Sequence, residues 1–146
     1  MTSVSVQTEP FDPGVEAEAL EQLGAGAIAT FTGLVRSDDG VDAMTLEHYP
    51  GMTEAALEAL ITEAKTRWSL AGARIVHRVG RLEVGARIVF VGTASAHRKD
   101  ALEACAFLID RLKTDAPFWK KEDRAGAESW VAARDKDEDA AARWKA

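Results

Sequence analysis

Three of the seven lysines in the chain fall within nine residues, in the segment LKTDAPFWKKE at 112–122. A proline and two large aromatic residues separate Lys113 from Lys120 and Lys121. Burial of a lysine amine beside an apolar wall disfavours its charged form and makes the neutral amine available as a base or nucleophile. The segment therefore indicates either amine chemistry or the binding of an anion.

The three lysines are predicted to have different surroundings. Lys113 falls in the last turn of a predicted helix, where the helix dipole favours a positive charge even without a function. Lys120 and Lys121 are adjacent in a predicted strand, so their side chains point to opposite faces. Lys120 shares its face with Phe118, whereas Lys121 is better explained as a solvated lysine on an edge strand. We expect at most one of these two lysines to face a given pocket.

A second group of candidates lies in SAHRKD at 95–100, where a predicted strand is followed by a helix. His97 and Arg98 lie at the predicted helix N-terminus, whose free N–H groups and dipole favour anions. An imidazole and a guanidinium would complete a phosphate or carboxylate site. An ordinary surface His-Arg pair near a helix cap fits the local pattern equally well.

Arg36 ends a predicted strand and opens the polar loop RSDDGVD at 36–42, a position where an arginine usually just marks solvent. Gly33, in the same strand, indicates a close backbone approach or a bulge. Taken together, the local chemistry predicts an anion-binding pocket. Its residues are Arg36, His97, Arg98, Lys113 and Lys120.

Composition excludes several classes of function. The net charge of -6 and the pI near 5.1 argue against nonspecific binding of nucleic acid, which needs a basic face. The sequence has no run of 18 apolar residues and no signal-peptide pattern, so we expect no membrane span and a cytoplasmic location. We expect no metal, because neither His48 nor His77 has a second ligand at metal spacing. We also expect no cofactor; the sequence contains no GxGxxG motif and no phosphate-binding loop signature.

Cys105 is the only cysteine, which excludes an internal disulfide and any multi-cysteine metal site. It falls on the apolar face of a predicted helix. A buried structural cysteine is therefore expected there, and not a reactive thiol.

The elements that would position these residues mix strands and helices without strict βα alternation. Helices are predicted at 11–23, 53–68 and 98–114, with a charged, solvated terminal helix from about residue 134. Strands are predicted at 4–9, 27–35, 43–49, 73–82 and 86–95, with short strand-like pieces at 118–122 and 128–133. The strands at 27–35 and 43–49 flank an Asp-Gly turn signal and are candidates for a hairpin. The predicted fold class is α+β, in a single domain over 1–146.

Local signals define the ends and the buried faces of the helices. Asp12 is the expected N-cap of the first helix, Pro13 its first residue, and Pro117 ends the third helix. The second helix is predicted to bury Leu57, Leu60, Ile61, Ala64 and Trp68. The third is predicted to bury Leu102, Cys105, Ala106, Ile109 and Leu112.

Five segments of the chain, in this order and at this spacing, resemble the MoaE family, the large, catalytic subunits of molybdopterin synthase. They are TFTGLVR, LEHYPGMTEAAL, IVHRVGRLEVG, VFVGTASAHR and LKTDAPFWKKE. The resemblance runs from about Gly26 to Trp130, and the combination SAHR…LK…APFWKKE is highly specific. It implies an α/β hammerhead-type fold with a smaller antiparallel β subdomain, and a homodimer flanked by two small carrier subunits in a heterotetramer.

The resemblance implies a sulfurtransferase of molybdenum cofactor biosynthesis. Its partner would be a ubiquitin-like carrier whose C-terminal Gly-Gly ends in a thiocarboxylate. Its substrate would be cyclic pyranopterin monophosphate, which receives two sulfur atoms to form the dithiolene of molybdopterin. This chain ends in RWKA and not in Gly-Gly, so we do not expect it to be the carrier. Since sulfur arrives on the partner, no catalytic cysteine is needed here.

Carried over onto this sequence, the resemblance implies that Lys113 and Lys120 are catalytic. Leu34 stands where the family commonly has a basic residue, so a contact from residue 34 would come through its backbone. The loop at 36–42 also looks short for the family, and which protomer supplies each pocket residue stays open. The full set of implied substrate-binding residues is Phe31, Leu34, Val35, Arg36, His97, Arg98, Lys113, Lys120, Lys121 and Glu122.

Two other functions compete with sulfur transfer. One is a non-catalytic dimer that binds the carrier or a phosphorylated small molecule, and the other is a hydrolase of a small phosphate ester. Binding needs only charge, so arginine would serve at positions 113 and 120, whereas catalysis by a neutral amine would not tolerate it.

Overall fold

The computed structural model describes residues 3–37, 40–124, 127–131 and 135–144. The helices are α1 (Pro13–Glu21), α2 (Met52–Arg67), α3 (Arg98–Asp115) and α4 (Asp135–Ala142). The strands are β1 (Val4–Gln7), β2 (Ala27–Leu34), β3 (Ala43–His48), β4 (Gly72–Arg78), β5 (Gly80–Glu83), β6 (Arg87–Ser95), β7 (Phe118–Arg124) and β8 (Ala127–Val131). They form two four-stranded sheets.

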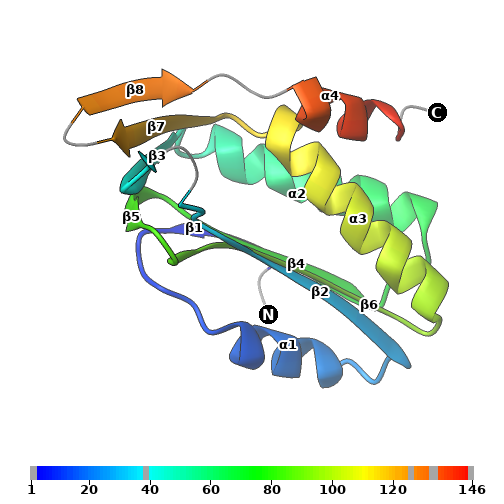
Figure 1. Ribbon diagram of the computed structural model, residues 1–146. Helices are drawn as coiled ribbons and strands as arrows, with labels where there is room; N and C mark the ends of the chain where they lie inside the picture. The colour runs from blue at the N-terminus through cyan, green and yellow to red at the C-terminus, as the bar shows by residue number, and fades with distance from the viewer. Residues whose placement is uncertain (1–2, 38–39, 125–126, 132–134, 145–146) are drawn as a thin grey trace.

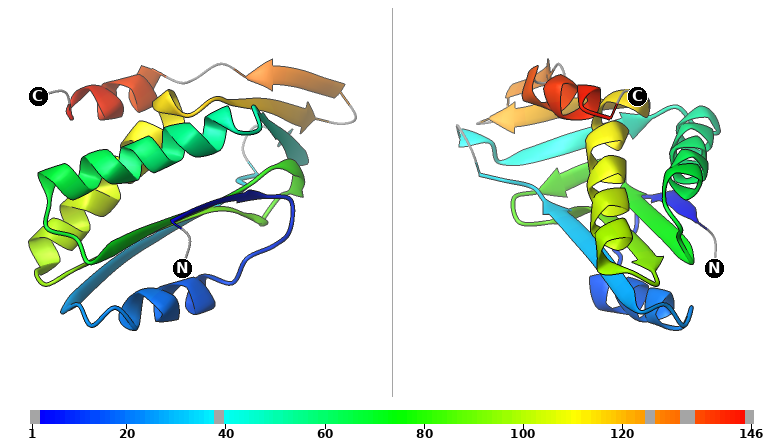
Figure 2. Two further views of the ribbon diagram at one scale, coloured as in Figure 1. Left: turned by 180° about the vertical axis from the view of Figure 1, so that it is seen from behind. Right: turned by 90° about the vertical axis from the view of Figure 1, so that its right-hand side faces the viewer.

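The first sheet has the strand order β1-β4-β6-β2. β1 runs parallel to β4, and the other neighbours are antiparallel. α2 and α3 cover one face of this sheet and α1 covers the other, so the sheet is the middle layer of three (Figures 1 and 2). This layering buries the β-branched and apolar residues of β4 and β6 on both faces.

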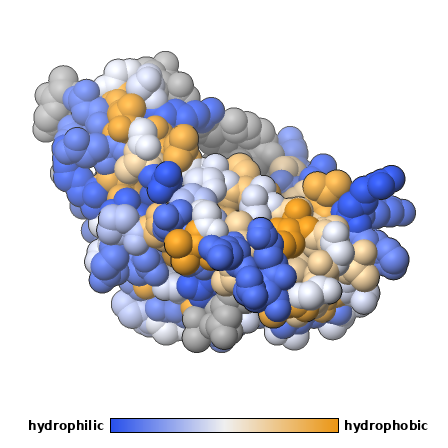
Figure 3. Space-filling model, turned by 90° about the horizontal axis from the view of Figure 1, so that it is seen from below, coloured by the Kyte–Doolittle hydropathy of each residue, from blue (hydrophilic) through white to orange (hydrophobic). Residues whose placement is uncertain are grey.

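α1 begins where the sequence predicts. The Asp12 carboxylate accepts a hydrogen bond from the backbone N–H of Gly14 at 2.8 Å, and Pro13 is the first helical residue. Leu20 is fully buried beneath this helix in a small core with Val76 and Phe90. On the face that carries α1, hydrophilic residues separate the apolar patches of the described surface (Figure 3).

The core between the first sheet and the two long helices contains the predicted face of α2, including Leu57, Leu60, Ile61 and Ala64. The predicted face of α3 needs correction, because the Leu102 side chain is 61% exposed and Ala106 and Ile109 are only partly buried. The buried residues of this helix are Ala101, Ala104, Cys105, Phe107, Leu108 and Leu112. Ala101 and Cys105 face the sheet instead, where the Thr93 hydroxyl donates to the Ala101 carbonyl at 2.6 Å. Small residues at these positions let α3 lie close to β2 and β6.

The second sheet is antiparallel, with the order β5-β3-β7-β8. Two predictions about strands are therefore wrong. The strands at 27–35 and 43–49 do not form a hairpin, since β2 pairs with β6 in the first sheet while β3 pairs with β5 and β7 in the second. The predicted strand at 73–82 is two strands in different sheets. Gly80, with a φ of +93°, turns the chain between them, and that conformation favours glycine.

The C-terminal helix is not simply solvated. It lies along α3 (Figure 1), and the residues that follow it anchor it there. The Trp144 ring packs edge-on against Trp68 and Phe107, with centroids 5.7 Å apart in both pairs. Its indole Nε1 donates to the Asp110 carboxylate at 2.6 Å. Residue 134, where the tail was predicted to begin, lies outside the described residues.

The architecture confirms the α+β class and an antiparallel second sheet. The two strand-like pieces predicted around residues 118–133 correspond to β7 and β8, although residues 125–126 and 132–133 lie outside the described part of the chain. Within the described residues, no helix has both the length and the apolar character needed to cross a bilayer.

The aromatic cluster of Trp68, Phe107 and Trp144 should fasten α4 to the rest of the fold. We expect Trp144→Ala to lower the free energy of unfolding by about 2–4 kcal/mol, because it removes two ring contacts and a hydrogen bond to a carboxylate. Urea denaturation measures this change. Trp130→Ala is the matched control, because this half-exposed tryptophan should cost about 1 kcal/mol or less. Equal losses in the two variants would contradict this account of α4.

Candidate active site

The LKTDAPFWKKE segment forms the C-terminal end of α3, the connection that follows it and the start of β7. Lys113 lies exposed in the last turn of α3, and Ala116 and Pro117 connect the helix to β7. The Phe118 ring then stacks on the His77 ring of β4, with centroids 3.9 Å apart and planes at 21°. We call the group Lys113, Lys120, His77 and Phe118 the lysine cluster.

β7 sends its two adjacent lysines to opposite faces, as predicted. Lys120 lies opposite the buried Leu46 of β3, so it belongs to the inner face of the second sheet together with Phe118. Its ammonium is 4.0 Å from the Glu122 carboxylate, whose residue is buried. The Lys120 side chain is 30% exposed and can still be reached from solvent.

Lys121 faces away from this group, on the outer face of the sheet. Its ammonium lies 3.9 Å from the Glu47 carboxylate and 4.4 Å from the centre of the Trp130 ring. These contacts give Lys121 a structural explanation and place it away from the lysine cluster. The structure therefore does not bring Lys121 into a common pocket with Lys120.

His77, which stacks on Phe118, is a buried, neutral histidine. Burial lowers its pKa to about 4; the positive charge of Lys113 and the nearby His48 act in the same direction, against the hydrogen bond to Arg78. Its Nδ1 lies 2.9 Å from the Arg78 carbonyl oxygen. A carbonyl only accepts, so Nδ1 carries the proton and the neutral ring has a fixed tautomer.

The end of β2 places Arg36 beside the inner core of the second sheet. Val35 is buried in that core, and its backbone N–H donates to the Ala86 carbonyl at 2.9 Å. Arg36 follows it and is exposed. The register of β2 shifts between Gly33 and Leu34, and a side chain at Gly33 would lie 2.9 Å from a Val89 methyl group. Of the two alternatives predicted for Gly33, the bulge is thus confirmed.

Two further residues of β2 occupy different surroundings. Leu34 is 52% exposed, so its apolar side chain faces solvent, whereas Phe31 packs half-buried against the main core. Residues 38 and 39 of the following loop lie outside the described residues.

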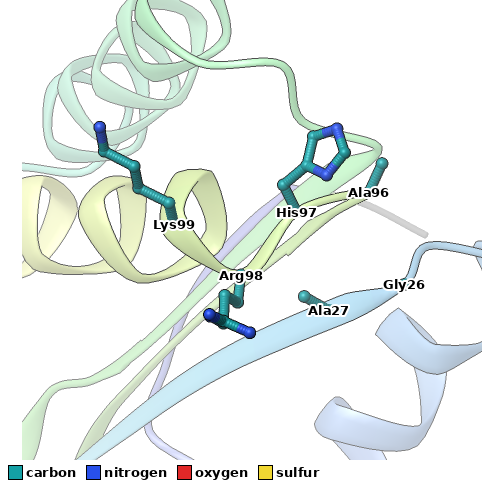
Figure 4. Close-up of a pocket in the computed structure, with 6 residues that line it drawn as sticks. All are labelled: Gly26, Ala27, Ala96, His97, Arg98 and Lys99. Atoms are coloured by element: carbon teal, nitrogen blue, oxygen red, sulfur yellow. The ribbon is translucent and has the colours of Figure 1, made fainter.

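The N-terminal end of α3 carries the other candidate cations. His97 is the N-cap residue, and Arg98 begins the helix. Together with Lys99 they border an open depression of about 470 Å³ that Gly26, Ala27 and Ala96 complete. Arg98 points toward β2 and Lys99 points away from it (Figure 4). Cations and free helix N–H groups at one depression suit an anion.

One chain does not unite the two ends of α3. Fifteen residue steps separate Arg98 from Lys113, which places their backbones about 22 Å apart along a straight helix. A phosphate held by His97 and Arg98 is therefore out of reach of Lys113 of the same chain. The sequence-based expectation of a single pocket containing all five cations is not met within one protomer.

Sequence reasoning missed the residues that fix the junction between α3 and β7. The buried Thr53 hydroxyl donates to the Pro117 carbonyl at 2.8 Å and accepts from the Tyr49 N–H at 3.0 Å. This threonine ties the start of α2 to the residue before Phe118. A threonine near a predicted helix start was visible in the sequence, but its partner lies 64 residues away and had no local signal.

Cys105 is buried, and burial raises the pKa of its thiol to about 12. The prediction of a structural, unreactive cysteine is confirmed. Among the described residues, no group of three His, Cys, Asp or Glu side chains is arranged to hold a metal ion.

The fold and these side chains define a class: an α+β protein with a cationic group at each end of one long helix. Comparison with known proteins specifies it further. The family model "MoaE protein" matches residues 6–115. A relative from Cereibacter sphaeroides, named "Molybdopterin synthase catalytic subunit", is 54% identical over 97% of this chain and 99% of its own. The chain belongs to the MoaE family.

Solved structures agree with this assignment. A "Molybdopterin biosynthesis MoaE protein" from Burkholderia ambifaria superposes with a TM-score of 0.85 at 50% identity, covering 99% of this chain and 98% of its own. A molybdopterin synthase from Staphylococcus aureus gives 0.84 at 32% identity, covering 90% and 98%.

Protonation of His77 should make stability depend on pH. Its folded-state pKa of about 4 lies below the ordinary 6.5, so the unfolded chain binds the proton first as the pH falls. The stability that the neutral His77 contributes is therefore fully present above pH 6.5 and is lost as the pH falls toward 4. Between pH 7 and 4.5 the wild-type free energy of unfolding should fall, and about 2 kcal/mol of this fall should come from His77. We expect His77→Phe, which has no titrating ring, to lack that part of the fall.

Urea denaturation at several pH values measures this dependence. Val76→Ala is the control, since Val76 is the neighbouring residue of β4 and packs on the opposite face of the sheet. It should lower stability by a similar amount at each pH. If His77→Phe keeps the wild-type pH dependence, His77 is not the titrating group.

Proposed function

We propose that this protein is the catalytic subunit of a molybdopterin synthase. It would transfer sulfur from the C-terminal thiocarboxylate of a small ubiquitin-like carrier to cyclic pyranopterin monophosphate. The observation that carries the proposal is the lysine cluster. Lys113 ends α3, and Lys120 lies on the same face of β7 as Phe118, whose ring stacks on His77, in a chain that belongs to the MoaE family.

The chemistry of both reactants explains why an acidic protein needs local cations. The substrate carries a phosphate and the carrier tail ends in a thiocarboxylate, so each brings a negative charge. Arginine and lysine side chains form strong charge-assisted hydrogen bonds with such groups. We assign Arg36, His97 and Arg98 to the phosphate and pterin, and Lys113 and Lys120 to the reacting groups.

The reaction can be written as a displacement followed by hydrolysis. The thiocarboxylate sulfur attacks a side-chain carbon of the pterin, a carbon–sulfur bond forms, and water or phosphate leaves. Water then cleaves the acyl–sulfur bond, which releases the carrier as a carboxylate and leaves a thiol on the pterin. A second carrier repeats these steps at the neighbouring carbon to complete the dithiolene.

Lys113 is the principal catalytic candidate. Its amine would transfer a proton to the leaving group or stabilise the oxyanion that develops during acyl–sulfur hydrolysis, and Lys120 would position the thiocarboxylate. Interactions that strengthen in the transition state raise the rate of the chemical step. The buried Cys105 has no part in this scheme, because the sulfur is supplied by the carrier.

The separation of the two cationic groups supports a site shared between two protomers. Since about 22 Å divides Arg98 from Lys113 within a chain, one substrate can contact both groups only if they come from different copies. A symmetric dimer would bring the start of α3 of one protomer to the lysine cluster of its partner, and would form two such sites. Each site would receive one carrier tail, giving a heterotetramer.

Replacement of Lys113 tests the proposal. With thiocarboxylated carrier and cyclic pyranopterin monophosphate in a single turnover, we expect Lys113→Ala to slow dithiolene formation by about 30- to 1000-fold, which corresponds to a loss of roughly 2–4 kcal/mol of transition-state stabilisation. Lys113→Arg should also be slow, because arginine keeps the charge but does not release a proton. Mass spectrometry of the pterin product gives the rate.

Lys65→Ala provides the matched control, since Lys65 is an exposed lysine in the last turn of α2. It should react at the wild-type rate. A Lys113→Arg variant with full activity would favour the non-catalytic binding function. Phosphate release in the absence of carrier would favour the hydrolase.

A further inference from the structure

The pairing of β3 with β7 ends at the junction where the chain passes from α3 into β7. The last pair in register is His48 with Phe118, so the next pair along the two strands would be Tyr49 with Pro117. Proline has no backbone N–H, so Pro117 cannot donate to the Tyr49 carbonyl as another residue could. The backbone groups of Tyr49 and Pro117 therefore need other partners at this junction.

Thr53 supplies these partners from the first turn of α2. Its backbone N–H donates to the Tyr49 carbonyl at 2.9 Å, and its hydroxyl accepts from the Tyr49 N–H at 3.0 Å. The same hydroxyl donates to the Pro117 carbonyl at 2.8 Å. Since a hydroxyl can accept and donate at once, one side chain joins the Tyr49 N–H to the Pro117 carbonyl. Thr53 thus bridges the two strands where their direct pairing stops.

The bridging hydroxyl is buried and is presented by an ordered turn. Thr53 has no exposed surface, so water does not compete for its hydroxyl. The turn before it is built around Gly51, whose φ of +86° favours glycine. The Gly51 N–H donates to the Glu54 carboxylate at 2.9 Å, which caps the start of α2. Thr53 is therefore a fixed support for Pro117.

The supported residue lies between the two candidate catalytic lysines. Pro117 follows Lys113 by four residues and precedes Lys120 by three. Lys113 belongs to α3, which is packed along the first sheet, whereas the place of Lys120 depends on where β7 begins. A fixed Pro117 carbonyl therefore sets how β7 leaves α3, and so where Lys120 lies relative to Lys113.

We propose that Thr53 is a positioning residue for the reaction: through the Pro117 carbonyl its hydroxyl fixes the start of β7, and thereby the placement of Lys120 relative to Lys113. The inference rests on the proposed sulfur transfer, because it assigns Thr53 a part in that reaction. Two groups that act on one reacting centre need a fixed separation, and small losses of alignment reduce the rate strongly.

Removal of the hydroxyl tests this role. Thr53→Val keeps the shape of the side chain but leaves the Tyr49 N–H and the Pro117 carbonyl without their partner. We expect the maximal single-turnover rate of dithiolene formation to fall about tenfold. The pterin concentration that gives half of that rate should change little, because the residues assigned to phosphate and pterin lie outside this junction. Thr53→Ser keeps the hydroxyl and should react at nearly the wild-type rate.

A double-mutant cycle separates positioning from a general loss of stability. In a Lys120→Ala background Thr53→Val should have little further effect, because the lysine that it places is gone. Val76→Ala is the control, since it destabilises the fold under α1, away from the junction, and should keep the wild-type rate. A rate loss in Val76→Ala as large as that in Thr53→Val, or equal fold-losses from Thr53→Val with and without Lys120, would overturn the positioning role.

A graded variant keeps the test decisive if the valine variant does not fold. Thr53→Cys replaces the hydroxyl by a thiol, which is a weaker hydrogen-bond donor and acceptor. It should react severalfold more slowly than Thr53→Ser. Equal rates for the serine and cysteine variants would contradict a role for the hydrogen bond.

A spectroscopic measurement tests the support of β7 without any substrate. In 15N-labelled protein, Thr53→Val should shift the backbone amide resonances of residues 118–120, whereas Thr53→Ser should leave them close to their wild-type positions. Unchanged resonances of 118–120 in the valine variant would mean that Thr53 does not position β7, whatever the activity shows. Failure of wild type to form dithiolene, with these shifts present, would instead contradict the proposed function and leave the support of β7 by Thr53 established.

Discussion

The length and rigidity of α3 are the constraint on which the arrangement of the candidate site depends. An 18-residue helix does not bend enough to bring its ends together, so it fixes the distance between His97 and Arg98 at one end and Lys113 at the other. The helix is held along its whole length. Its inner face packs on β2 and β6, and α2 and α4 lie against its sides (Figures 1 and 2). Each chain therefore carries two cationic groups about 22 Å apart, one at each end of α3.

The second sheet gives the C-terminal group its shape. After α3 ends, the chain returns as β7, and the pleat of that strand alone decides that Lys120 faces inward and Lys121 outward. The junction is fixed from two sides. The Thr53 hydroxyl holds the Pro117 carbonyl, and the His77 ring holds Phe118. These contacts order the backbone between two flexible lysine side chains, and such preorganisation is what electrostatic catalysis requires.

Much of the fold could be predicted because local signals state it clearly. Asp12 and Pro13 define the start of α1, Pro117 follows the end of α3, and alternating residues assign Lys120 and Lys121 to different faces. The predictions failed where a choice depended on long-range pairing. Nothing in the sequence near Gly80 says that the following strand joins a different sheet, and helical periodicity alone could not decide between Leu102 and Ala101 as the buried residue.

The candidate site was predictable in its residue types but not in its geometry. Charge, position in a helix and family resemblance selected Arg36, His97, Arg98, Lys113 and Lys120. The distance along α3 shows that His97 and Arg98 do not meet Lys113 within a protomer. No sequence pattern marked His77 or Thr53 as part of the junction. Both act through partners distant in sequence, and a contact of that kind leaves no periodic or compositional signal.

Mixed dimers test the shared site most directly. Protomers with Lys113→Ala and protomers with Arg98→Ala, carrying different affinity tags, can be co-expressed and the heterodimer purified. A site shared between protomers predicts that each pure variant reacts far more slowly than wild type and that the heterodimer recovers about half of the wild-type rate of dithiolene formation, because one of its two sites is intact. A heterodimer of His97→Ala and Arg98→Ala should recover nothing, since each of its sites keeps one defect. A Lys113→Ala and Arg98→Ala heterodimer without activity, from protein that is folded and dimeric, would contradict the shared site.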